Sequence, residues 1–166
     1  MYKLFTVTIL RFVSIYFILS VIVAAYFYPG GNMHDPLQIG YSFTHNFLSD
    51  LGGYYTRSGE VNFLSAFFFN FSMFLFVLVG VGFLFVPWLF KDNSITFYLS
   101  ILGSFFFFFG TIYFAAVGLT PHDLYLREHI YFAVNAFRLI APALLIYIIV
   151  FFRSSIPNFY SYLTLI

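Results

Sequence analysis

The sequence predicts an all-α integral membrane protein, a helical bundle of four transmembrane helices with a short extracytoplasmic interfacial helix. Of the 166 residues, 62% are hydrophobic and only 8% are charged, whereas a soluble chain carries about 25% charged residues. Four apolar runs exceed the roughly 18 residues that mark a bilayer span. We expect one transmembrane domain over residues 1–166, with spans at about 5–28, 61–90, 95–119 and 128–152 and an outer loop at 29–60.

The composition also excludes several classes of protein. The chain has no cysteine, which excludes disulfides, thiolate metal sites and thiol catalysis. Its net charge of +1 offers no basic surface for a nucleic acid, so we expect no nucleic-acid partner. The expected partners are the lipid bilayer and other membrane protein subunits, because the 28 phenylalanines are compatible with lipid and with helix packing.

The first span is expected to be a retained helix. It ends at the turn signal Pro29-Gly30-Gly31. Its apolar stretch is longer than the 7–15 residues of a signal-peptide core, and Arg11 interrupts it. Arg11 lies close enough to the helix end to extend its guanidinium toward the interface.

The loop at residues 29–60 contains a predicted short helix over Ser42–Leu51. Ser42 or Thr44 would be its N-cap, and Gly52-Gly53 would end it. Apolar side chains gather on one side of such a helix, which is typical of a helix that lies at the interface or dips partly into the bundle.

The second and third spans are expected to be antiparallel neighbours, because only Lys91-Asp92-Asn93 separates them. Trp88 near the end of the second span suits an interfacial position. The third span carries small residues at intervals of about two turns, which predicts a stripe for close helix packing: Gly103, Gly110 and Gly118.

Thr120-Pro121-His122-Asp123 resembles a helix start, with Thr as the N-cap, Pro in the first position and an acid in the first turn. This helix is expected to enter the membrane near Ile130 and to end at Arg153. The apolar segment 159–166 is too short to span, so we expect an interfacial tail or the start of a fifth span.

The distribution of basic residues predicts the orientation. One side has Lys3, Arg11, Lys91 and Arg153 with the single acid Asp92; the other has two arginines and five acids. The positive-inside rule therefore predicts cytoplasmic termini and extracytoplasmic loops at 29–60 and 120–128. All four histidines then lie outside.

The two extracytoplasmic segments together form what we call the outer polar cap. We expect Asp50, Ser49 and Asn46 to bond across to His122 and His129 and so close the outer end of the bundle. The predicted members of the outer polar cap are His45, Asn46, Ser49, Asp50, His122, Asp123 and His129.

These residues also allow three kinds of chemistry, none of which we favour. Zinc held by three of His45, Asp50, His122 and His129 would be a plausible catalytic centre, but no metal-binding motif is present. His122 and His129 would lie about 10 Å apart along one helix, too far to share an ion. Ser49, Asp50 and His129 contain the residue types of a catalytic triad, which only geometry defines. Haem bound by His45 and His129 is the last alternative.

Three polar residues are predicted to lie inside the membrane: Asn70, Asn135 and Arg138. A charge at mid-span costs roughly 2.5–3.5 kcal/mol even on the lenient scale, so Arg138 should find a partner. No acid lies at that depth. Its candidate partners are Asn70, Asn135, Thr111, a tyrosine, a backbone carbonyl, an anionic ligand or another subunit.

The segment Asn46-Phe47-Leu48-Ser49-Asp50-Leu51-Gly52 resembles an element of a prokaryotic family of multi-spanning membrane proteins. The family is known as domain of unknown function nine-nine-eight and is distantly similar to the eukaryotic DRAM-like proteins. The resemblance also implies a polar segment after the third span, matched by Pro121, Asp123 and His129. Members usually have six spans, and the family implies no activity. The resemblance implies the plasma membrane of a bacterium or archaeon.

The sequence therefore favours a non-enzymatic protein, an accessory subunit or lipid-contacting protein of a larger membrane assembly. The first alternative is an outer-leaflet hydrolase with a His/Asp site, with or without zinc. The second is a haem-binding membrane subunit. No catalytic residue is assigned beyond the candidates Ser49, Asp50 and His129.

Overall fold

The computed structural model describes residues 4–165, without the side chain of Phe5. Within this range four helical segments are long and apolar enough to cross a membrane: Thr6–Phe27, Phe63–Phe90, Ser94–Leu119 and Leu126–Phe152. The predicted all-α membrane bundle is confirmed, and the chain is an integral membrane protein. Lys3, which contributed to the predicted orientation, lies outside the described residues.

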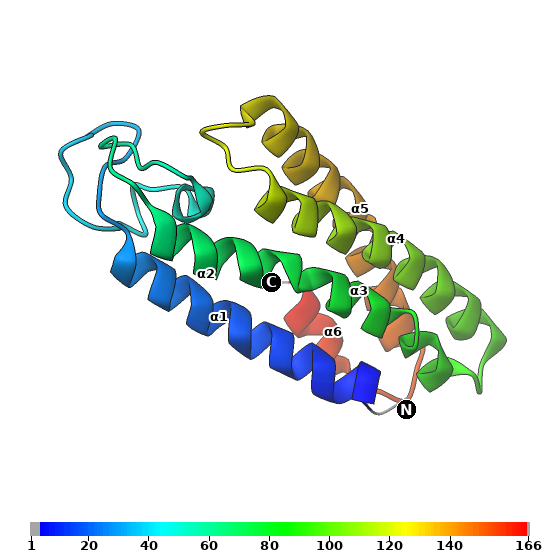
Figure 1. Cartoon of the computed structure of the whole chain (residues 1–166). Coiled ribbons are helices and arrows are strands. Elements are labelled where there is room, and N and C mark those ends of the chain that lie inside the picture. Colours follow the sequence, from blue (N-terminus) through cyan, green and yellow to red (C-terminus); the bar gives the residue numbers. More distant parts are fainter. Residues whose placement is uncertain (1–3, 166) are drawn as a thin grey trace. The chain divides into compact units, whose positions relative to one another are not determined.

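The elements follow one another along the chain as Figure 1 shows. They are the π-helical turn η1 (Leu4–Ile9), α1 (Leu10–Phe27), the 3-10 helix η2 (Leu48–Gly52), α2 (Phe63–Phe74), α3 (Phe76–Phe83), the 3-10 helix η3 (Val86–Phe90), α4 (Ser94–Leu119), α5 (Leu126–Phe152) and α6 (Asn158–Thr164). Contacts within the chain divide it into two compact units. The cap unit comprises residues 12–76 and 114–133, and the stem unit comprises the other described residues.

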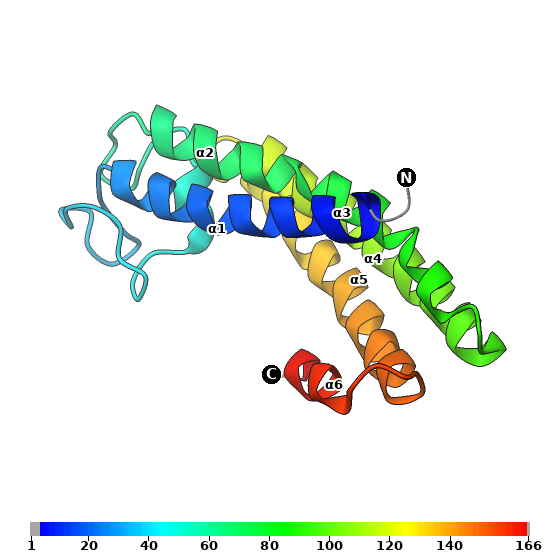
Figure 2. The ribbon, with the colours of Figure 1, turned by 90° about the horizontal axis from the view of Figure 1, so that it is seen from below.

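The cap unit contains most of α1, η2, α2 and the adjoining ends of α4 and α5. Helices α1 and α2 lie side by side in both ribbon views (Figures 1 and 2). Their buried side chains form one apolar core with η2 and the end of α4, made of Ala24, Tyr28, Leu51, Phe69, Met73 and Val117. Removing these side chains from contact with lipid or water fixes η2 against the helices.

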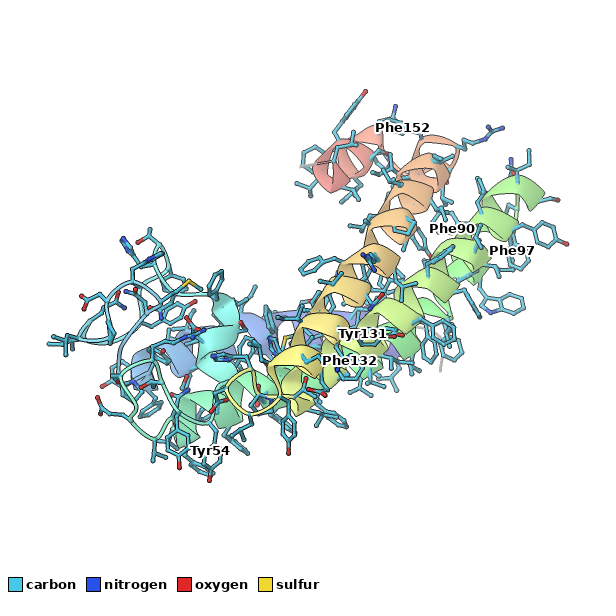
Figure 3. All side chains as sticks on the ribbon, turned by 90° about the horizontal axis from the view of Figure 1, so that it is seen from above. Tyr54, Phe90, Phe97, Tyr131, Phe132 and Phe152 are labelled. Carbon is cyan, nitrogen blue, oxygen red and sulfur yellow. The ribbon has the colours of Figure 1, made fainter. Side chains whose placement is uncertain are left out.

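The stem unit is built around Tyr147 of α5, whose side chain is 3% exposed. Its hydroxyl lies 2.6 Å from the Ser104 hydroxyl and donates to the Ser100 carbonyl at 3.2 Å. A phenol inside an apolar core needs a hydrogen-bond partner. The two contacts of the Tyr147 hydroxyl with Ser104 and Ser100 therefore set the register between α4 and α5. At the end of α5, the ring of Phe152 packs on Tyr162 of α6 with 5.5 Å between centroids (Figure 3).

The predicted small-residue stripe of α4 is confirmed. A Cβ atom on Gly103 would lie 3.0 Å from the ring of Tyr147, within the stem unit. A Cβ atom on Gly118 would lie 2.8 Å from the Cβ of Met73, within the cap unit. Both positions therefore allow a helix-to-helix approach that a larger residue would prevent.

The second span is not one continuous helix. It is interrupted after α2 at Leu75 and again after α3, where η3 begins. Pro87 explains the second interruption, because proline has no backbone N–H and disfavours the α conformation in the residue before it. Trp88 in η3 is 58% exposed, as suits an aromatic residue at the membrane interface.

The predicted helix over Ser42–Leu51 is wrong. The chain makes a turn up to Asn46, and only Leu48–Gly52 is helical, as the 3-10 helix η2. Two side chains accept backbone N–H groups here: Asn46 Oδ1 accepts from Ser42 at 3.0 Å, and Asp50 Oδ2 accepts from Phe47 at 3.0 Å. Such local side-chain bonds compete with a regular helix.

The predicted helix start at Thr120 is also wrong, since α5 begins at Leu126. The Thr120 hydroxyl donates to the Ala116 carbonyl of α4 at 2.8 Å, so it does not cap a following helix. Asp123 accepts two backbone N–H groups from a distant segment, those of Tyr54 at 2.9 Å and Tyr55 at 2.8 Å. Tertiary bonds therefore hold residues 120–125 as a turn.

Candidate functional site

Asp50 is the centre of the outer polar cap, and its carboxylate is 2% exposed. Oδ2 accepts hydrogen bonds from Asn46 Nδ2 at 3.1 Å and from the Phe47 backbone N–H at 3.0 Å. Oδ1 lies 3.5 Å from Arg57 Nε and 3.5 Å from His122 Nε2. One buried carboxylate thus ties together η2, the following loop segment and the turn before α5.

The charge of Asp50 is balanced mainly by Arg57. Burial lowers the pKa of His122 below its ordinary value, and the nearby Asp50 charge opposes that shift only in part. His122 is therefore uncharged at neutral pH, whereas the side chain of Arg57 is 37% exposed and always protonated. A buried carboxylate without such a partner would be strongly disfavoured.

The backbone of η2 is held by polar side chains of α2 and of the residue just before it. Asn62 Nδ2 donates to the carbonyls of Leu51 at 3.1 Å and Gly53 at 3.0 Å. Ser65 Oγ donates to the Leu51 carbonyl at 3.0 Å, and Asn70 Nδ2 donates to the Gly52 carbonyl at 2.9 Å. Buried backbone carbonyls outside a regular α-helix require such internal partners.

The contact between Asn70 and Gly52 shows how far along α2 the 3-10 helix η2 extends. Asn70 lies seven residues after the first residue of α2, which is about 10 Å along the helix axis. Since its side chain reaches Gly52, the end of η2 lies at the same level. A Cβ atom on Gly52 would lie 2.7 Å from the ring of Phe69. The lack of a side chain at Gly52 therefore permits η2 to lie directly on α2.

Two tyrosines border Asp50 and stay protonated. Burial and then the Asp50 charge raise the pKa of Tyr28 to about 12 and that of Tyr41 to about 12. The Tyr28 hydroxyl donates to the Gly31 carbonyl at 3.0 Å, and Asn46 Nδ2 donates to the same carbonyl at 2.8 Å. These phenols therefore serve as hydrogen-bond donors and packing surfaces beside Asp50.

The structure brings together only some of the predicted cap residues. Asn46, Asp50 and His122 form one contact group, and the ring of His129 lies 5.9 Å from that of His122. His129 Nδ1 lies 2.7 Å from the Thr120 carbonyl oxygen, to which it can donate. It thus fixes the turn after α4 and does not bond to Asp50.

His45 and Ser49 lie apart from this group. The side chain of His45 is exposed, and its Nδ1 contacts the hydroxyls of Thr44 at 2.8 Å and Ser42 at 3.2 Å. Ser49 is half-buried, and within the described part of the chain its hydroxyl bonds to neither histidine. The Ser49–Asp50–His129 arrangement is not assembled as a triad.

The donor set for a metal ion is not assembled either. Among residues 4–165, no group of three or more His, Asp and Glu side chains is placed to hold a metal ion. His45 and His129, the suggested haem ligands, are each bonded to their own neighbours. The geometry at Asp50 is that of a structural ion pair with additional hydrogen bonds.

Sequence reasoning missed three residues of this site, namely Arg57, Asn62 and Ser65. Arg57 was counted only for orientation, although it is one of only two basic residues on the expected outer side. Asn62 and Ser65 lie three residues apart at the start of an apolar span, so they share one helix face. This polar pair was a sequence signal for a neighbouring segment whose backbone carbonyls need donors.

Arg138 differs from these residues because its side chain is exposed on α5. Asn70, one of its expected partners, donates instead to Gly52. No hydrogen bond or ion pair joins Arg138 to any other described residue. The arginine is thus placed at mid-span without the internal partner that the sequence led us to expect.

The low pKa of His122 predicts a pH dependence of stability. Asp50, Arg57, Asp123 and His129 surround the ring, but burial dominates and lowers its pKa below 6.5. The unfolded state therefore binds a proton more readily, so the stability from His122 is present above pH 6.5 and is lost as the pH falls below that value.

We expect the thermal midpoint of the chain in mild detergent to decrease as the pH is lowered from 7.5 to 5.5. The substitution His122→Asn should reduce the slope of the midpoint against pH. Unfolding followed by circular dichroism at several pH values measures it. His34→Asn, at an exposed histidine of the loop at residues 29–60, is the control that should keep the slope. An unchanged slope in His122→Asn would contradict the prediction.

Comparisons of the chain with protein-family models, with curated proteins and with solved structures find no match.

Proposed function

We propose that this integral membrane protein is a non-enzymatic subunit of a larger membrane assembly. The observation that carries the proposal is Arg138, an exposed guanidinium at the middle of α5 with no partner among the described residues. An ionisable side chain at that depth almost always faces protein or a water-filled cavity, because exposure to lipid is costly. A neighbouring subunit would provide that protein surface.

The outer polar cap supports a structural role. Asp50 Oδ2, Asn62 Nδ2 and the carboxylate of Asp123 bond to groups of the same chain, and Asp50 Oδ1 faces Arg57. A catalytic centre needs groups that a reacting molecule can reach, whereas Asp50 is 2% exposed and Asn62 is 1% exposed. The cap would hold the 3-10 helix η2 against α2, while the exposed faces of the spans contact lipid and partner subunits.

The orientation and source belong to the same proposal. The basic residues favour cytoplasmic termini, with the outer polar cap on the extracytoplasmic face of a bacterial or archaeal plasma membrane. The resemblance to the prokaryotic family of unknown function is consistent with this source. In this chain Asn46, Asp50 and Gly52 of the shared element are the residues that seat η2.

Arg138→Leu is expected to dissociate the assembly. Wild-type chain in its native membranes, extracted with mild detergent, should migrate on a native gel as a complex larger than the 19.3 kDa chain. Arg138→Leu should shift it to the free chain. Arg153→Leu, at the end of the same helix, is the matched control and should leave the complex intact.

A wild-type chain that migrates alone would contradict this proposal, as would a complex whose size is unchanged in Arg138→Leu.

A further inference from the structure

Helix α5 of the stem unit has two opposite faces. Its buried face contains Ala136, Ala143, Tyr147 and Val150, which pack within the chain. Arg138 lies about 200° around the helix from Ala136, since each residue turns the helix by about 100°. The side chains on this second face are exposed: Val134, Phe137, Arg138, Ala141 and Leu145. Packing within the stem unit therefore leaves the Arg138 face open.

The depth of Arg138 prevents it from reaching water by itself. It lies about 18 Å from the start of α5 at Leu126 and about 21 Å from the end at Phe152, at 1.5 Å per residue. Arginines escape the hydrocarbon by extending to the interface only near helix ends. A lipid headgroup at the surface is thus too distant, and the counter-charge must itself lie near the mid-plane.

A second copy of this chain cannot provide that counter-charge. The six acids are Asp35, Asp50, Glu60, Asp92, Asp123 and Glu128. The acid nearest to Arg138 along α5 is Glu128, about 15 Å away along the helix axis. Asp50 of η2 is buried and already faces Arg57 of its own chain. A copy with the same orientation in the membrane would place its Glu128 at that same level. The carboxylate must come from a different protein.

We propose that α5 docks, through Arg138, on a transmembrane helix of a different protein that carries an aspartate or glutamate near the bilayer mid-plane. This inference rests on the proposed function and names the partner chemistry of that assembly. A planar guanidinium can bind a carboxylate with two parallel hydrogen bonds. Ala141, one turn along the same exposed face, permits the close helix approach that such a bond requires.

The test reconstitutes the purified full chain in phosphatidylcholine vesicles with a synthetic 24-residue Leu/Ala helix that has one central Asp. Energy transfer between labels on the chain and on the helix measures binding. We expect the Asp helix to bind about tenfold more tightly than an all-apolar helix, with a central Asn between them. Arg138→Leu should abolish the preference, and Arg153→Leu should preserve it.

Equal binding of the Asp and apolar helices by the wild-type chain would overturn the proposal, and so would a preference that persists in Arg138→Leu. Displacement of the Asp helix by small amounts of oleate would point to a lipid carboxylate as the occupant and would also overturn it. If native membranes show an assembly that depends on Arg138 while the vesicles show no preference, the assembly proposal stands and the carboxylate partner is wrong. Circular dichroism confirms that each variant is folded.

Discussion

Asp50→Ala is expected to release the outer polar cap and to lower the unfolding free energy by about 3–5 kcal/mol, because it removes two hydrogen bonds to a charged group at about 1.5–3 kcal/mol each. The substitution leaves the Phe47 N–H without its acceptor and removes one acceptor of Asn46 Nδ2. It also removes the anion that faces Arg57 and His122 at 3.5 Å. Because these contacts come from separate segments, their loss should free the whole loop rather than one bond.

Thermal unfolding in mild detergent should show a midpoint lower by roughly 10 °C. Trypsin added from the outside should cut more readily after Arg57, whose side chain would no longer be held by Asp50. Asp35→Ala is the matched control, because Asp35 lies in the same loop with an exposed hydrogen bond to Leu37. Equal midpoints and equal cleavage of the two variants would contradict the role assigned to Asp50.

Asn62→Ala is expected to have the second largest effect, about 2–3 kcal/mol, because buried acceptors left unpaired cost about 1–3 kcal/mol each. Asn62 is 1% exposed and donates to the carbonyls of Leu51 and Gly53. The Leu51 carbonyl would keep its bond from Ser65, while the Gly53 carbonyl would lose this donor. Without water at that depth, η2 should detach from α2.

A graded pair of variants tests this assignment. Asn70→Ala removes a single bond, the one to the Gly52 carbonyl, so its effect should be about 1 kcal/mol. Asn158→Ala, at an exposed position that begins α6, should leave stability unchanged. The thermal midpoint should be highest for Asn158→Ala, intermediate for Asn70→Ala and lowest for Asn62→Ala. An Asn70 variant less stable than the Asn62 variant would show that depth, rather than the number of bonds, decides the cost.

The local sequence rules predicted one helix end correctly in this chain but predicted two helix starts wrongly. The 3-10 helix η2 ends at Gly52 with Gly53 as its C-cap, at the Gly52-Gly53 stop that the sequence predicted. Thr120 and Ser42 have the side chains of N-caps, but Thr120 bonds back into α4 and Ser42 lies in a turn held by Asn46. Capping rules consider only neighbouring residues, whereas Asp123 bonds to Tyr54 and Tyr55, nearly 70 positions away.

The sequence by itself determined the four apolar spans and the small-residue stripe of α4, because length and hydrophobicity act locally and require no knowledge of neighbours. It also identified Asp50 and His122 as cap residues. Only the tertiary structure decided that Arg57 balances Asp50, that Asn62 and Asn70 hold η2, and that Arg138 faces away from its own chain. Hydrogen bonds and ion pairs join residues distant in sequence, so the geometry that chooses among candidate partners exists only in the folded chain.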